Sequence, residues 1–237
     1  PVRVVAVSPS GDVLFLDYSR GTNGRALALR SKIPNATESV DLKKTDKLIF
    51  ITRRDTIAPC VARLTPELAV AFFMLGESIE TSAGDPARAG QPKHEVGFNP
   101  FIIGSEEEEG NRLYDILRTN PYMEVYFLNI GSVGKGADAP GMNPEGTKIT
   151  KDVSSKILAF IARQGPQAKE NWVLDRDWKY EVPVVMPGAP QWKNLNPKRH
   201  YSAAAYSRMT RELREERVSW LAQFPGLNPA IQAAIKS

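Results

Sequence analysis

One helical segment is apolar on every side, and it constrains the fold of this chain more than any other segment. Thr65-Pro66-Glu67 is a strong helix start, because Thr can accept a backbone N–H as N-cap, Pro loses nothing at the first helical position and Glu favours the positive end of the helix dipole. The following residues 69–75 read Ala-Val-Ala-Phe-Phe-Met-Leu. A helix without a polar face belongs in the interior. The small-residue loop Ser78–Asp85, of a kind that lies against a ligand, comes next.

Two continuous apolar runs predict strands that are buried on both faces. Lys47–Thr52 and Glu124–Asn129 show no alternation of polar and apolar residues, as expected inside a covered sheet. Residues 2–7 and 13–17 predict two more strands joined by a turn-rich linker. The run 180–185 is short and interrupted by proline, which predicts an edge or terminal strand.

Capping residues predict the remaining helices. Ser105 opens a capping box before a helix with one core-facing stripe, and Thr150 caps a helix that reaches about Gln164. A long helix is expected over 201–224, with a short one after residue 229. The sequence therefore predicts an α/β fold with a mixed sheet, organised as a single domain over residues 1–237.

The composition excludes several classes of protein. The 237 residues are 42% hydrophobic and 24% charged, as in an ordinary globular protein, and the single Cys60 excludes an internal disulfide framework or a cysteine metal cluster. The net charge of +4 comes without a basic stripe interleaved with aromatic residues. No apolar run approaches the length of a membrane span. We therefore expect a cytoplasmic protein without nucleic-acid or membrane partners.

Few segments carry a recognisable chemistry. The phosphate loop Gly-x-x-x-x-Gly-Lys-[Ser/Thr] is absent, and the glycine-rich run 131–136 departs from the dinucleotide-binding spacing. His94 and His200 are expected in surface or hydrogen-bonding roles, and no zinc ligand set is predicted. The acidic run 106–109 is explained by the positive end of a helix dipole, so no metal site is predicted there.

Arg25 is the most interesting charged residue, because it lies in the glycine-rich loop Gly21–Arg25. Its planar guanidinium suits a phosphate or a carboxylate, but the sequence alone favours a surface ion pair.

A series of short motifs follows one order along nearly the whole chain. These motifs are 48–65, 78–85, 126–131, 146–154, 182–188 and 195–197. They resemble, in turn, the strand and "Pro-Pro-Val-x-x-Leu-Thr" helix start, the "Ala-Gly-Thr-Glu" loop, "Tyr-Leu-Val-Asn-Thr-Gly-Trp", "Gly-x-Arg-Ile-x-x-x-x-Thr", "[Ile/Val]-Pro-x-x-x-Pro-Gly" and "Leu-[Asp/Asn]-Pro" of ATP-dependent phosphoenolpyruvate carboxykinase. The chain therefore resembles the C-terminal, nucleotide-binding part of that family.

The resemblance implies roles for four residues. Arg25 matches the family arginine that meets the transferred phosphoryl group, where a guanidinium stabilises charge on the equatorial oxygens. Lys148, Ile149 and Ser154 match the positions that hold adenine. The resemblance implies that Lys148 lies along the base, that Ile149 makes apolar and backbone contact, and that Ser154 offers its hydroxyl. The implied ligands are ATP and a small 2-oxo acid such as oxaloacetate, with a divalent metal (Mg or Mn) in the parent enzyme.

The chain departs from the family pattern at several positions. Lys148 and Ser154 replace an arginine and a threonine, Ser132 replaces a tryptophan, Thr81 replaces a lysine, and the loop 133–145 is longer than expected. These changes indicate a divergent branch. The phosphate loop, the metal ligands and the substrate-anchoring residues of the family lie upstream of the matched part, so we expect a piece of a longer chain that lacks phosphoryl-transfer activity by itself. The missing N-terminal lobe is then its partner.

Two other functions remain open from the sequence. A related enzyme could keep the nucleotide site and phosphorylate another small molecule. A non-catalytic module could reuse the fold to bind a nucleotide or a partner, since fold does not fix function.

Overall fold

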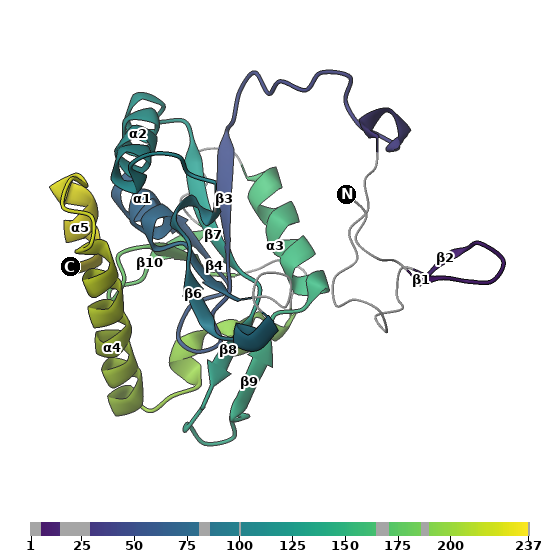
Figure 1. The fold of residues 1–237 in the computed structure, drawn as a ribbon. Helices are drawn as coiled ribbons and strands as arrows, with labels where there is room; N and C mark the ends of the chain where they lie inside the picture. The colour runs from purple at the N-terminus through teal and green to yellow at the C-terminus, as the bar shows by residue number, and fades with distance from the viewer. Residues whose placement is uncertain are drawn as a thin grey trace. The chain divides into compact units, whose positions relative to one another are not determined.

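The computed structural model describes residues 6–14, 29–80, 86–99, 101–164, 171–185 and 190–236. The chain divides into two compact units, one formed by residues 1–45 and 79–92, the other by 46–78 and 93–237 (Figure 1). In the smaller unit, β1 (Ala6–Val7) pairs antiparallel with β2 (Val13–Leu14), and short 3-10 turns cover Arg30–Lys32 and Pro86–Arg88. The rest of the two strands predicted over 2–7 and 13–17 lies outside the described residues, as do residues 81–85.

The larger unit is built on a five-stranded sheet with the order β10-β11-β4-β7-β3. Its strands are β3 (Lys47–Thr52), β4 (Val61–Leu64), β7 (Glu124–Asn129), β10 (Trp172–Leu174) and β11 (Glu181–Pro183). β3 and β7 run parallel in register, and the other neighbouring strands are antiparallel. The predicted mixed sheet is confirmed.

Helices cover both faces of this sheet. They are α1 (Pro66–Leu75), α2 (Glu106–Thr119), α3 (Lys151–Arg163), α4 (Ala203–Leu221) and α5 (Pro229–Lys236). Val125 and Phe127 of β7 join an apolar cluster with α1, whereas Tyr126 and Leu128 join a second cluster with α3. Since successive residues of a strand face opposite sides, α1 and α3 lie on opposite faces of the sheet, as Figure 1 shows.

The predicted interior helix α1 is confirmed, together with its cap. Thr65 Oγ1 accepts the N–H of Leu68, Pro66 occupies the first turn, and Gly76 ends the helix in the left-handed conformation. The helix packs against α2, α4, α5 and the sheet, which explains why no polar face is needed. The helix starts predicted at Ser105 and Thr150 are confirmed as well.

Two predictions about strand position were wrong. β3 was expected to be buried on both faces, but it ends one side of the described sheet and the side chain of Ile51 is 55% exposed. β11 was expected at an edge, but it lies between β10 and β4. Pro183 is tolerated because it is the last residue of a strand that pairs with β4 only at Glu181.

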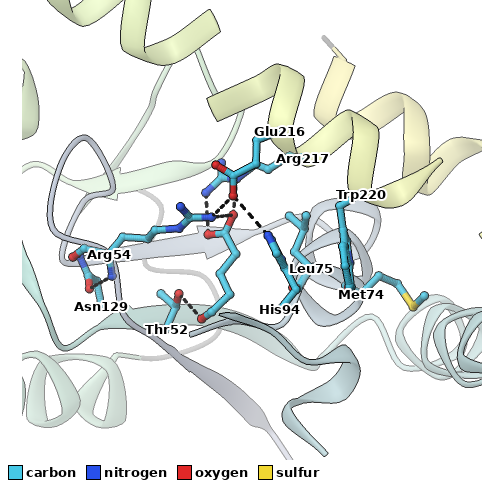
Figure 2. A network of polar contacts seen from close by, with 10 residues as sticks. Thr52, Arg54, Met74, Leu75, His94, Asn129, Glu216, Arg217 and Trp220 are labelled. Atoms are coloured by element: carbon cyan, nitrogen blue, oxygen red, sulfur yellow. Dashed lines mark hydrogen bonds and ion pairs between the residues drawn. The ribbon is translucent and has the colours of Figure 1, made fainter. Parts of the chain in front are cut away.

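A buried ion network joins α4 to the sheet (Figure 2). Glu77, the first residue of β5 (Glu77–Ile79), is 1% exposed, and its carboxylate accepts hydrogen bonds from Arg217 Nε at 2.7 Å and Arg217 Nη2 at 2.9 Å. Arg54 Nη2 lies 3.2 Å from the same carboxylate and 2.7 Å from Glu216 Oε1. Burial alone would raise the pKa of Glu77, but the two guanidinium groups outweigh it and hold the pKa at about 2.

Aromatic rings surround the cationic part of the network. The guanidinium of Arg217 lies 4.8 Å from the ring centre of Phe72 and 4.6 Å from that of Trp178. His94, in β6 (Pro92–His94), stacks on Trp220 at 4.5 Å, and its Nε2 lies 3.2 Å from Glu216. A buried pair that is this well hydrogen-bonded is costly to break from one side.

We predict an acid-dependent loss of stability from Glu77. Its pKa is about 2 in the folded state and about 4.3 in an unfolded chain. The carboxylate therefore stabilises the fold above about pH 4.3, and this contribution, about 3 kcal/mol, is lost as the pH falls toward 2. Urea unfolding from pH 7 to pH 2.5 measures it.

Glu77→Gln should flatten that acid dependence and lower the free energy of unfolding at pH 7 by about 3–5 kcal/mol, because two arginines lose their partner. Glu215→Gln, at an exposed glutamate of α4, is the matched control and should change stability by less than about 0.5 kcal/mol. Equal stability of the two variants at pH 7 would contradict the assigned role of Glu77.

Candidate functional site

The carboxyl ends of the parallel strands β3 and β7 gather the segments that the sequence singled out. Thr52 and Asn129, the last residues of the two strands, are register partners, and Ile130 N donates to Thr52 O at 3.0 Å. The hairpin formed by β8 (Ser132–Lys135) and β9 (Glu145–Lys148) follows β7, and α3 follows β9. In open α/β sheets, ligands bind outside the carboxyl ends of parallel strands.

The side chain of Asn129 joins the loops that leave both strands. It is fully buried, its Oδ1 accepts the N–H groups of Arg54 and Gly131 at 3.0 Å each, and its Nδ2 donates to Arg54 O at 3.0 Å and Ser132 O at 3.3 Å. An amide offers two acceptor and two donor positions, so all four are used. Figure 2 shows Asn129 next to Arg54, where it meets the ion network.

The β3–β4 loop forms a second edge for β8. Asp55 Oδ1 accepts the backbone N–H of Ser132 at 3.1 Å and its hydroxyl at 3.0 Å. Farther along, Gly134 N donates to Thr56 O at 3.0 Å and Lys135 N to Asp55 O at 2.9 Å. β8 is therefore fixed to the β3–β4 loop along its length, from Ser132 to Lys135.

Two glycines of the hairpin have a steric explanation. Gly134 and Gly146 have φ of 86° and 75°, a region that favours glycine. A Cβ on Gly134 would lie 2.1 Å from His200 Nδ1, and one on Gly146 would lie 2.7 Å from Val133 O. The glycine-rich run therefore permits close packing of a hairpin, in agreement with its departure from a dinucleotide fingerprint.

Three of the four predicted site residues lie on one continuous segment at the start of α3. Lys148 ends β9 and is exposed, whereas Ser154 is partly buried in the first turns of the helix. Ile149 is 4% exposed, its N–H donates to Gly131 O at 3.0 Å, and its side chain belongs to the apolar cluster beneath α3. Thr150 caps the helix by accepting Val153 N. Arg25 lies outside the described residues.

The surroundings of this segment suit an anionic or polar ligand better than acid–base catalysis. Lys148 and Lys151 are both exposed next to the positive end of α3. The one cysteine is unsuited to nucleophilic attack, because burial raises the pKa of the Cys60 thiol to about 12. Within the described ranges, no cluster of three or more His, Cys, Asp or Glu side chains could hold a metal ion. None of the described helices is long and apolar enough to cross a membrane.

A separate cavity of about 650 Å³ lies between β10, β11 and the 3-10 turns at Pro190–Leu195 and Pro197–Arg199. None of Lys148, Ile149 and Ser154 lines it. The size of a cavity does not identify a site by itself. We place the candidate site at the ends of β3 and β7, because the hydrogen bonds of Asn129 and Asp55 join the predicted segments there.

The chain is similar to known carboxykinases. The family model described as phosphoenolpyruvate carboxykinase matches residues 3–192. The chain is 32% identical to the ATP-dependent phosphoenolpyruvate carboxykinase of Aeropyrum pernix, over 94% of this chain and 42% of that protein. It is 26% identical to the enzyme of the same name from Parvibaculum lavamentivorans, over 90% of this chain and 39% of that protein. The chain therefore spans about two fifths of the length of these relatives.

We predict that Asn129→Asp destabilises the protein by about 3 kcal/mol or more, because the new oxygen would face the carbonyls of Arg54 and Ser132 in a buried position. Asn143→Asp is the matched control, since the side-chain oxygen of the exposed Asn143 accepts a hydrogen bond from Glu145 N and a carboxylate can do the same. Urea unfolding measures both variants. Equal free energies of unfolding for Asn129→Asp and Asn143→Asp would refute the central role of the Asn129 amide.

Proposed function

The chain belongs to the phosphoenolpyruvate carboxykinase family, and from this premise we propose that it is the adenine-binding, C-terminal part of an ATP-dependent carboxykinase. The proposal covers residues 1–237 as one part of a longer protein, because the relatives extend well beyond the matched region. The observation that carries it is the continuous segment from Lys148 to Ser154. This segment joins a hairpin strand to a capped helix at the carboxyl ends of β3 and β7.

The geometry supports different uses for the three residues. Lys148 is exposed and free to lie along a base, and the hydroxyl of Ser154 is nearby in the same helix start. Ile149 is buried in the apolar cluster beneath α3, so it supports the segment and can offer a ligand only a small apolar contact. Lysine is a point charge on a flexible stem, which gives weaker stacking on a flat base than arginine would.

The parent protein would couple two reactions on one substrate. Decarboxylation of a 2-oxo acid such as oxaloacetate leaves an enolate, whose oxygen then takes the γ-phosphoryl group of ATP, and ADP and CO₂ are released. We propose that Arg25 stabilises the charge on the phosphoryl oxygens during the transfer. The resemblance assigns the divalent metal to the missing N-terminal lobe. The proposed place of action is the cytoplasm.

A related small-molecule phosphotransferase is the second candidate. It is favoured by the replacement of the family arginine, threonine and tryptophan by Lys148, Ser154 and Ser132. A substrate screen with the complete protein separates the two enzymes. A non-catalytic binding module predicts nucleotide binding without turnover in the complete protein.

We predict that the chain binds adenosine, AMP and ATP with dissociation constants within about threefold of one another, because its adenine site lacks a phosphate loop. Lys148→Met should weaken the binding of all three ligands about tenfold, because the ammonium that lies along the base loses one charge-assisted contact with it. Lys236→Met, at an exposed lysine of α5, is the matched control and should bind like the wild type. Ligand-observed NMR titration measures these affinities, and a wild-type chain that binds none of the three ligands would refute the proposal.

We further predict that the chain alone does not form phosphoenolpyruvate from oxaloacetate and ATP. A coupled assay with the complete protein as positive control tests this, and turnover by the isolated chain would contradict it. In the complete protein, Arg25→Ala should raise the activation free energy of turnover by about 3 kcal/mol or more, as expected when a transition-state contact is lost. An unchanged rate would remove Arg25 from the mechanism.

A further inference from the structure

The tip of the β8–β9 hairpin is attached to the N-terminus of α4 by side-chain hydrogen bonds. Asp138 Oδ1 accepts Ser202 N at 2.6 Å, and Asp138 Oδ2 accepts the hydroxyl of Ser202 at 2.7 Å. The hydroxyl of Tyr201 donates to Lys135 O at 2.7 Å. The same Ser202 hydroxyl accepts the N–H of Ala205 and caps α4.

His200 completes the attachment through its backbone and its ring. Its carbonyl accepts the N–H groups of Asp138 and Ala139, both at 3.1 Å. The ring is 1% exposed, and its Nε2 faces the carbonyl of Asn194 at 2.6 Å, so this nitrogen carries the proton. The ring lies against Gly134, where the missing Cβ leaves room for it.

The hairpin depends on such contacts because it buries little apolar surface. Val133 is its only buried hydrophobic side chain in the apolar clusters, whereas Lys135, Glu145 and Lys148 are exposed. A two-stranded hairpin is at best marginally stable by itself. Asp55 and Thr56 of the β3–β4 loop hold β8, and Tyr201 holds its last residue, Lys135. The tip beyond β8 is held by Ser202 and by the carbonyl of His200.

The register of the hairpin transmits this restraint to the candidate site. β8 and β9 pair Lys135 with Glu145 near the tip and Ser132 with Lys148 at the base. A strand that is fixed at both ends cannot slip by a residue, and a slip would turn every side chain to the other face. The register therefore links the orientation of Lys148 to the attachment of the tip.

We propose that Asp138, Tyr201 and Ser202 are positioning residues of the nucleotide site, which hold the β8–β9 hairpin against α4 and thereby orient Lys148. The proposal rests on the function proposed above, because it assumes that Lys148 contacts the nucleotide. The hydrogen bonds from Ser202 also lower the pKa of Asp138, in keeping with a carboxylate that remains ionised in this contact.

The test compares three variants by amide hydrogen exchange of residues 132–148, read by mass spectrometry, and by ATP affinity. Asp138→Ala should accelerate exchange across the hairpin about tenfold, because local opening becomes easier. Tyr201→Phe removes one hydroxyl from the same contact and should give a smaller acceleration. Asp138→Asn should exchange like the wild type, since its amide can still accept from Ser202 N and donate to the Ser202 hydroxyl.

Asp115→Ala, at an exposed aspartate of α2, is the control and should leave hairpin exchange unchanged. ATP affinity should fall in Asp138→Ala and return in Asp138→Asn, while melting temperatures stay within a few degrees of the wild type. Unchanged exchange in both Asp138→Ala and Tyr201→Phe would overturn the attachment. Faster exchange with unchanged ATP affinity would overturn the positioning role. A wild-type chain that binds no ATP would refute the proposed function, while the exchange data would still decide the attachment.

Discussion

The site depends on one buried amide, the side chain of Asn129. The parallel strands β3 and β7 end at the same edge of the sheet, so the loops that leave them lie close together. The backbone groups of these loops no longer have a partner strand and need other hydrogen-bond partners. Asn129 supplies partners to the loop after β3 and to the turn before β8, with its own four hydrogen-bonding positions filled. The directions of the β3–β4 loop and of the hairpin are fixed together as a result, and Asp55 can then meet Ser132.

Helix α4 connects this arrangement to the rest of the larger unit at two levels. Near its C-terminal half, Arg217 pairs with the buried Glu77, and Arg54 of the β3–β4 loop shares that carboxylate. At its N-terminus, Ser202 holds the tip of the hairpin through Asp138. Helix α4 and its cap therefore contact both the loop that carries Asp55 and the hairpin that carries Lys148. Side chains on loops gain precision in this way, because a rigid element sets their distance from one another.

The sequence predicted the elements whose signals are local and could not predict those that depend on distant partners. The sequence predicted α1, α3, β3 and β7 because helix caps and apolar runs are patterns of adjacent residues. β4, β8, β9 and β10 have at most four residues each, and they form only because a partner strand or loop is present. Lys148, Ile149 and Ser154 came from the family resemblance. Their supports, such as the contact of Asp55 with Ser132, join residues 77 positions apart, and no local pattern signals such a pair.

The register of the hairpin gives a common location to two departures from the family pattern. Lys148 replaces an arginine and Ser132 replaces a tryptophan, and the structure pairs these two positions directly across β8 and β9. Facing residues in a sheet interact with one another, and the resemblance implies a planar guanidinium opposite an aromatic ring where this chain has a flexible ammonium opposite a small hydroxyl. Asp55 accepts the hydroxyl of Ser132, whereas the described hydrogen bonds of Asn129, Asp55 and Ser202 with this region do not use the side chain of Lys148. Two of the departures from the family pattern therefore lie together at the base of the hairpin, and the hydrogen bonds that hold the hairpin do not depend on the identity of Lys148.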